Sequence, residues 1–164
     1  MESYNSQPES PMQLHTQSAP PMKWHKFLIY FSLWAGALLI ISDGCTLLTG
    51  LHYGGNAEQV YRYFSSLRSV DCAFAVIYFG IAAFMIYTRF QLAGFKQGAP
   101  GKLTLLYILQ LIITLAYGLI VSNIVGMSFS EAMGETAITS LVSSIVMIFI
   151  NRSYYGKRDY LFVN

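Results

Sequence analysis

Four long apolar runs interrupt the chain, and they constrain its fold more than any other feature. They cover residues 27–48, 70–87, 103–121 and 133–150. At 1.5 Å of rise per residue, a helical run of about 20 residues spans the roughly 30 Å hydrocarbon core of a bilayer. Only 11% of the 164 residues are charged, whereas a soluble domain carries about 25%. The sequence therefore predicts an all-α integral membrane protein, a four-helix bundle with four spans.

The fourth run is the most polar of the four, because serines interrupt it after Ile138. A start signal nevertheless precedes it. Ser128 stands three residues before Glu131, the spacing of a capping box, in which each side chain bonds the backbone of the other residue. We therefore count this run as a span.

The basic residues indicate the orientation of the bundle. Lys and Arg are enriched in the short cytoplasmic connections of membrane proteins. Eight of the ten basic residues lie before the first span, between the second and third, and after the fourth: Lys23, Lys26, Arg89, Lys96, Lys102, Arg152, Lys157 and Arg158. With four spans, these three segments lie on one side. The sequence predicts that both termini are cytoplasmic and that the protein resides in the plasma membrane.

The segments outside the spans have distinct compositions. Residues 1–22 are polar and contain Pro and Ser without an apolar period, which is typical of a disordered tail. Residues 23–156 form the predicted bundle, and residues 157–164 form a short cytoplasmic tail. In the first outer connection, residues 56–67 have an apolar helical period. This pattern predicts an interfacial helix on the outer surface, and a lid over a ligand site is the alternative interpretation.

Asp43 is a carboxylate inside the first apolar run. At 100° per residue, it shares one helix face with Ser32, Gly36 and Gly50. Small residues mark helix–helix contacts in membranes, because they let backbones approach closely. A carboxylate facing lipid would cost several kcal/mol. We therefore expect Asp43 to face protein, in the outer third of its span.

The other spans also carry polar stripes, and a bundle would turn these stripes inward. Five residues form the candidate intramembrane polar site: Asp43, Asp71, Tyr78, Gln110 and Tyr117. In one interpretation these groups are interhelical hydrogen-bonding partners, with Asp43 bonded to a Tyr or Ser or paired with Arg62 or Arg68. In the other, Asp43 is a proton or cation site of a small transporter or channel. Asp71 is expected to begin its helix, where a carboxylate suits the helix dipole.

Other chemistry has little support in the sequence. Cys45 and Cys72 are both predicted near the outer face, so they form a candidate disulfide, but the C-x-x-C pair of a thiol oxidoreductase is missing. The histidines do not cluster at metal-ligand spacing, and no phosphate-binding loop or hydrolase motif occurs. The basic residues are too few for nucleic-acid binding. We expect no metal, no cofactor and no enzymatic activity.

Three segments resemble a group of small four-span proteins of low-GC Gram-positive bacteria: "KWHKFLIYFSLWAGALL", "YTRFQLAGFKQGAP" and "NRSYYGKRDYLFVN". The resemblance extends from about Lys23 to the end of the chain. No activity is assigned to that group, so the resemblance implies a bacterial plasma membrane. It also implies a neutral amide at the position of Asp43, which would argue against an essential acid there.

The sequence alone thus favours a non-enzymatic multi-pass membrane protein that packs with the lipid bilayer and with a second copy or another membrane protein. A small proton- or cation-coupled transporter or channel using Asp43 is the alternative. A thiol redox protein using Cys45 and Cys72 at the outer face is a more distant one.

Overall fold

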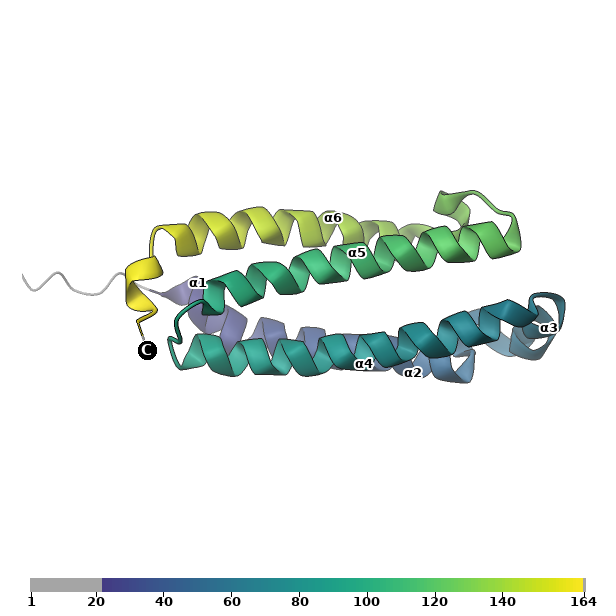
Figure 1. Cartoon of the computed structure of the whole chain (residues 1–164), viewed down its shortest axis with the longest axis horizontal. Helices are drawn as coiled ribbons and strands as arrows, with labels where there is room; N and C mark the ends of the chain where they lie inside the picture. Colours follow the sequence, from purple (N-terminus) through teal and green to yellow (C-terminus); the bar gives the residue numbers. More distant parts are fainter. Residues whose placement is uncertain (1–21, 164) are drawn as a thin grey trace, which may run out of the picture.

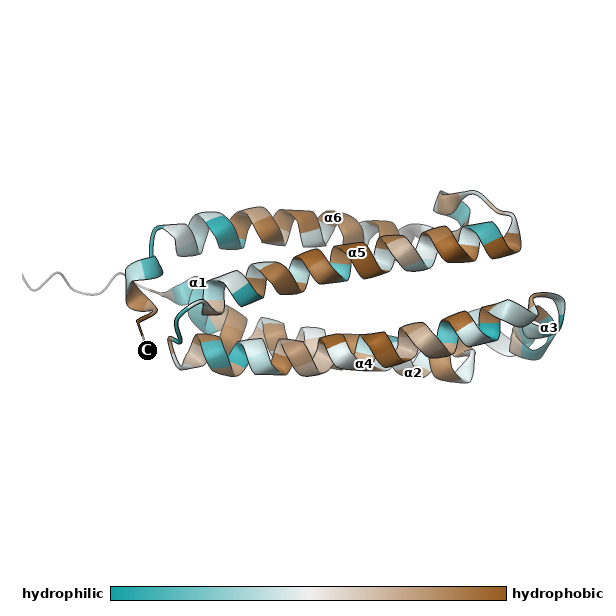
Figure 2. Cartoon of the chain, viewed as in Figure 1, coloured by the Kyte–Doolittle hydropathy of each residue, from teal (hydrophilic) through white to brown (hydrophobic). Residues whose placement is uncertain are grey.

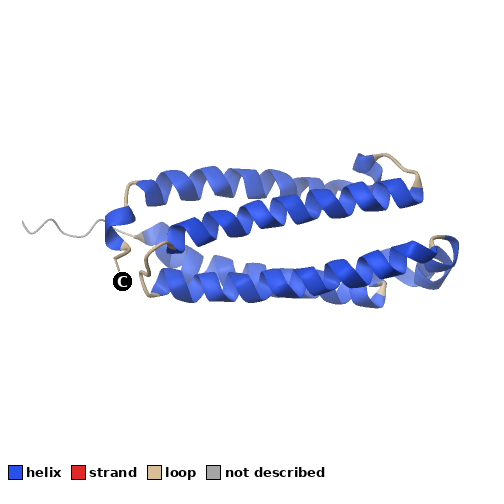
Figure 3. Cartoon of the chain, in the orientation of Figure 1, coloured by secondary structure: helices blue, strands red, loops and turns tan. Residues whose placement is uncertain are grey.

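The computed structural model describes residues 22–163. Residues 1–21 and 164 lie outside the described residues, and with them nearly all of the predicted N-terminal tail. Within the described part, every regular element is a helix. Figure 3 shows this helical content directly. The predicted all-α class is therefore confirmed.

Four long helices run alternately in opposite directions (Figure 1). They are α2 (Leu33–Thr49), α4 (Ser65–Ala93), α5 (Ala99–Val125) and α6 (Phe129–Gly156). α2 packs along α4, α5 packs along α6, and α4 joins the two pairs by packing against α5. The bundle thus consists of two antiparallel helical hairpins. Both ends of the described chain lie at the same end, which we call the terminal end, and α3 lies at the opposite loop end.

The N-terminal helical stretch is longer than the first apolar run. It starts with α1 (Lys23–Phe27), continues through a π-helical segment (Leu28–Ser32) and passes into α2. At the loop end, a 3₁₀ segment (Leu51–Asn56) leads into α3 (Ala57–Tyr63). The structure therefore has a short helix in the connection between α2 and α4, but residues 65–67 of the predicted interfacial helix already belong to α4.

Three helical stretches of the described chain are long and apolar enough to cross a membrane. They are Lys23–Tyr63, Ser65–Ala93 and Ala99–Val125, and α6 is not among them. Figure 2 shows apolar residues along much of the length of the long helices. Large side chains such as Leu38, Phe149 and Ile112 are exposed there. Such apolar surfaces are compatible with contact to the hydrocarbon chains of lipids.

The predicted capping box at the start of α6 is confirmed. The backbone N–H of Ser128 donates to the Glu131 carboxylate at 3.0 Å, and the Glu131 N–H donates to the Ser128 hydroxyl at 3.4 Å. α6 then bends at Gly134, whose φ of +67° is non-helical. The regular part of α6 therefore begins close to the start of the fourth apolar run.

The main core lies at the terminal end. Leu28, Leu33, Leu92, Leu103 and Leu106 are almost completely buried there. Towards the loop end, a smaller cluster is formed by Leu47, Phe74 and Ala75 against residues of α5. No described side chain of α6 is buried before Asn151. α6 is thus firmly packed at the terminal end only.

Candidate functional site

Asp71 is the most deeply buried acid in the described chain, with 0% of its surface exposed. It lies on α4, which begins at Ser65. The carboxylate is therefore well past the first helical turn, and the expectation that Asp71 begins its helix is not met. A buried carboxylate needs hydrogen-bond donors, because burial without them costs several kcal/mol. The surrounding side chains supply these donors.

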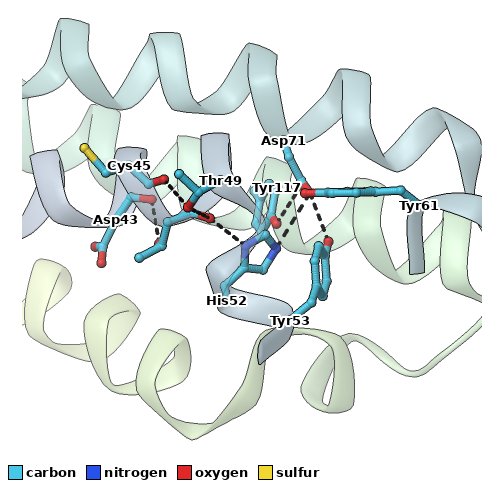
Figure 4. A network of polar contacts seen from close by, with 9 residues as sticks. Asp43, Cys45, Thr49, His52, Tyr53, Tyr61, Asp71 and Tyr117 are labelled. Atoms are coloured by element: carbon cyan, nitrogen blue, oxygen red, sulfur yellow. Dashed lines mark hydrogen bonds and ion pairs between the residues drawn. The ribbon is translucent and has the colours of Figure 1, made fainter. Parts of the chain in front are cut away.

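Three tyrosine hydroxyls donate to this one carboxylate (Figure 4). Tyr53 and Tyr61 both donate to Oδ2, at 3.1 and 2.9 Å, and Tyr117 donates to Oδ1 at 3.0 Å. Tyr53 and Tyr61 come from the connection between α2 and α4, whereas Tyr117 comes from α5. The carboxylate therefore joins the connection between α2 and α4 to both helical hairpins. We call these four residues the Asp71 cluster.

His52 borders the Asp71 cluster. Its Nδ1 lies 3.2 Å from the backbone oxygen of Thr46, and its Nε2 lies 3.7 Å from Oδ2 of Asp71. A carbonyl oxygen can only accept, so Nδ1 must carry the proton of the neutral ring. Gly50, with φ of +75°, turns the chain so that His52 reaches this position.

The tyrosines of the connection stay protonated, as the geometry requires. Burial first, and then the hydrogen bond to Asp71, raises the pKa of Tyr61 to about 12. Burial and the nearby carboxylate also raise the pKa of Tyr53. The two rings meet edge to face at 5.5 Å, and the guanidinium of Arg68 lies 5.1 Å from the Tyr61 ring centre. Both hydroxyls therefore remain donors throughout the physiological pH range.

The Asp71 cluster can anchor the connection between α2 and α4, because its polar groups bond to one another. Both carboxylate oxygens already accept bonds, and the donors are phenols rather than nucleophiles or catalytic bases. Within the part of the chain that the structure describes, no group of three or more His, Cys, Asp or Glu residues could hold a metal ion. The cluster is best understood as a structural clamp.

Asp43 lies outside this cluster. It is exposed on α2, and among residues 22–163 neither Arg62 nor Arg68 forms an ion pair with it. Its carboxylate and the thiol of Cys45 point to opposite sides of α2 (Figure 4). The reason is that α2 turns a different face to α4, so that Asp43 lies on the flank of that contact. Within the single chain Asp43 is therefore exposed, although its carboxylate lies close enough to Tyr78 of α4 for the two side chains to interact electrostatically.

The remaining predicted residues are dispersed. Tyr78 is half-buried and packs on the smaller core cluster, while Gln110 is half-buried on α5. Cys45 is exposed, Cys72 is half-buried, and both are free thiols. The candidate disulfide is therefore not formed. Of the five predicted polar residues, a hydrogen bond joins Asp71 and Tyr117, and Asp43 and Tyr78 lie close enough to interact electrostatically.

Sequence reasoning missed the roles of His52, Tyr53 and Tyr61. All three lie in the connection, where the apolar period of residues 56–67 predicts a helix face and no hydrogen bond to a carboxylate. A usable signal was present: these residues follow the span that contains Asp43 and lie within 20 residues of a carboxylate that needs donors. Helical periodicity could not find them, because the chain between them is not a regular helix.

The fold and the cluster define the class of protein: in the described residues it consists of two helical hairpins, with three helical stretches long and apolar enough to cross a membrane and a clamped connection between α2 and α4. Comparisons with known proteins add no narrower assignment. No protein-family model, curated protein or solved structure matches the chain.

Proposed function

We propose that this chain is a multi-pass plasma-membrane protein with four spans and cytoplasmic termini, and that it acts without catalysis by packing against another transmembrane helix. The three apolar stretches support insertion. The predicted orientation is supported by the basic residues at the terminal end, which would face the cytoplasm. α6 would complete the set of four spans, and its exposed apolar side chains, such as Val142 and Phe149, would then contact lipid.

One observation carries the proposal of lateral packing. Asp43 is exposed in the outer third of its apolar span, where a carboxylate that faces lipid must reach water or a polar partner, because at the centre of a span it costs about 2.5 kcal/mol or more. Its neighbour on the same face, Leu39, is also exposed. A helix from a second copy or from another membrane protein, with a hydroxyl, amide or basic side chain, would relieve this cost. The face of α2 around Asp43 and Leu39 is therefore the proposed contact.

Crosslinking from two adjacent positions tests this proposal. Leu39 and Leu38 are 67% and 66% exposed, but helical geometry turns Leu39 to within about 40° of Asp43 and Leu38 about 140° away. In a background with Cys45→Ser and Cys72→Ser, Leu39→Cys should crosslink to a membrane partner or to a second copy, and Leu38→Cys should not. Equal crosslinking from both positions, or none, would reject the α2 contact.

A small transporter or channel using Asp43 is the second candidate, and a specific asymmetry favours it. At the terminal end, His25 packs with Phe95, Tyr155 and Phe162 and closes the bundle. Towards the loop end, the polar residues of α6, such as Ser143, are exposed like Asp43. This arrangement would suit a polar space that opens to the outside.

Water access separates the two functions. In the cysteine-free background, Ser143→Cys should react with an impermeant maleimide added outside intact cells if a polar opening exists. A partner helix at this position would protect the thiol. Loss of a proton-linked uptake or efflux phenotype in a folded Asp43→Asn variant would favour transport over packing.

A further inference from the structure

A groove runs between the first turns of α5 and the last turns of α6, at the terminal end of the bundle. Its volume is about 390 Å³, and its walls include Gly101, Leu105, Ile108, Asn151, Arg152 and Asp159. None of these residues belongs to the Asp71 cluster or to the α2 contact. The groove is therefore a separate surface feature, and we call it the α5–α6 groove.

Asn151 in the wall of this groove has an unused hydrogen-bond donor. The side chain is 0% exposed, and its Oδ1 accepts a bond from the indole Nε1 of Trp24 at 3.0 Å. Because an indole N–H can only donate, this bond fixes which end of the amide is oxygen. The Nδ2 group has no partner among the described residues. A buried donor without a partner costs about 1–3 kcal/mol, so an acceptor-bearing ligand would relieve it.

The polar part of the groove carries both signs of charge. Arg152 and Asp159 are exposed members of its wall. The N-terminus of α5, beginning at Ala99, adds the positive end of a helix dipole, which attracts phosphate oxygens. A ligand that complements this wall carries a phosphate for Arg152 and Asn151 and a cationic group for Asp159.

The rest of the groove is apolar. Leu105 and Ile108 lie one and two turns further along α5, towards the middle of its apolar stretch, and both are exposed. Along the axis of α5, the charged part of the groove therefore lies at the terminal end, and the apolar part comes next towards the middle of the bundle. A ligand with a charged head and a hydrocarbon tail can cover both parts of the groove, whereas a fully soluble phosphate compound leaves the apolar part uncovered.

We propose that the α5–α6 groove binds an aminophospholipid, a lipid whose headgroup holds both a phosphate and a primary amine. Arg152 and the Nδ2 group of Asn151 bind the phosphate, Asp159 binds the ammonium group, and Leu105 and Ile108 contact an acyl chain. Basic pockets between spans at the cytoplasmic surface are known to hold lipid headgroups. The inference rests on the proposed membrane insertion but not on the proposed α2 contact.

A pair of glycine variants tests the site without removing any hydrogen bond. An added side chain would meet no atom within 4 Å at either Gly101 or Gly80. Gly101 lines the groove, whereas Gly80 lies on the exposed surface of α4. Gly101→Leu should fill the groove and abolish retention of phosphatidylethanolamine in native mass spectrometry of the detergent-purified protein. Gly80→Leu should retain it like the wild type.

Charge variants test the headgroup assignment. Arg152→Gln should lower retention of phosphatidylethanolamine about ten-fold, the loss expected for one charge-assisted hydrogen bond. Arg62→Gln removes the same charge at the loop end and should change nothing. Asp159→Asn should remove the preference for phosphatidylethanolamine over phosphatidylglycerol while total lipid retention persists.

The outcomes separate the inference from the proposed function. Equal retention in Gly101→Leu and Gly80→Leu would overturn the groove as a lipid site. Equal wild-type binding of phosphatidylglycerol, or equal stabilisation by soluble phosphoethanolamine, would overturn the aminophospholipid assignment. If the protein is found in the membrane fraction but retains no lipid, this inference alone fails. Absence from the membrane fraction would instead reject the proposed function.

Discussion

The two oxygens of the Asp71 carboxylate have unequal numbers of partners, and this inequality predicts a ranking of two similar variants. Oδ1 accepts only from Tyr117, while Oδ2 accepts from Tyr53 and Tyr61 and lies near His52. Tyr117→Phe therefore leaves one oxygen of a buried carboxylate without a donor. Tyr61→Phe leaves Oδ2 with another hydrogen bond. The first substitution should destabilise the protein more.

The expected magnitudes follow from the charge on the acceptor. A hydrogen bond to a charged group contributes about 1.5–3 kcal/mol, and a neutral one contributes about 1 kcal/mol. We expect Tyr117→Phe to lower the free energy of unfolding by about 2–3 kcal/mol, because the bond is lost and no donor replaces it. Tyr61→Phe should cost about 1 kcal/mol, because the donor from Tyr53 remains. Tyr63→Phe, at a largely exposed side chain, is the matched control and should cost nothing measurable.

The assay is reversible unfolding in mixed micelles, followed by helical circular dichroism. A double-mutant cycle identifies the acceptor, because in an Asp71→Leu background both tyrosine substitutions should become nearly neutral. A cost for Tyr61→Phe that equals or exceeds that for Tyr117→Phe would refute the reasoning. Costs that persist in the Asp71→Leu background would show that the hydroxyls stabilise the protein through some other group.

Three further predictions concern other parts of the chain. Burial lowers the pKa of His25 from its ordinary value of 6.5, and its Nε2 has no partner among the described residues. The unfolded chain therefore binds a proton more readily than the folded protein, and the stability should fall as the pH drops below 6.5. His25→Phe should remove this pH dependence in thermal unfolding. Bonds to Ser128 lower the pKa of Glu131, so the stabilisation by this capping box is present above the ordinary pKa and is lost in acid. Ser128→Ala should increase hydrogen exchange in the first turn of α6 at neutral pH, and the difference between variant and wild type should shrink in acid. Gly50 has φ of +75° and an added Cβ would lie 2.8 Å from α3, so Gly50→Ala should cost about 1–2 kcal/mol or more, whereas Gly80→Ala should not destabilise the protein in the same unfolding assay.

Much of the fold follows from simple patterns in the sequence. The apolar runs predict the long helices, because only a helix satisfies the backbone of such a run within itself. The spacing of Ser128 and Glu131 predicts the start of α6 from local chemistry alone. These features depend on residues close together in the sequence, and for that reason they need no knowledge of packing.

The candidate site depends on contacts that helical periodicity does not describe. Tyr53 and Tyr61 reach Asp71 across a connection with a left-handed turn at Gly50, and Tyr117 reaches it from another hairpin. A face diagram of one helix shows which side chains share a stripe. It does not show which of several stripes the neighbouring helix will cover. The partner of α2 is α4, and its contact leaves Asp43 on the flank.

Asp43 and Asp71 therefore illustrate opposite solutions to the same physical problem. Both are carboxylates in largely apolar surroundings, and both need donors to offset the cost of leaving water. Asp71 has three donors within its own chain, so its presence is explained by folding alone. Asp43 is exposed, without an ion pair in the described residues, and within the chain it has only the electrostatic interaction with Tyr78. If the protein spans a membrane as proposed, the hydrogen-bond donor that Asp43 requires must come from water in a polar opening or from another molecule. For this reason, experiments on function should start at Asp43 rather than at the Asp71 cluster, whose carboxylate already has its donors.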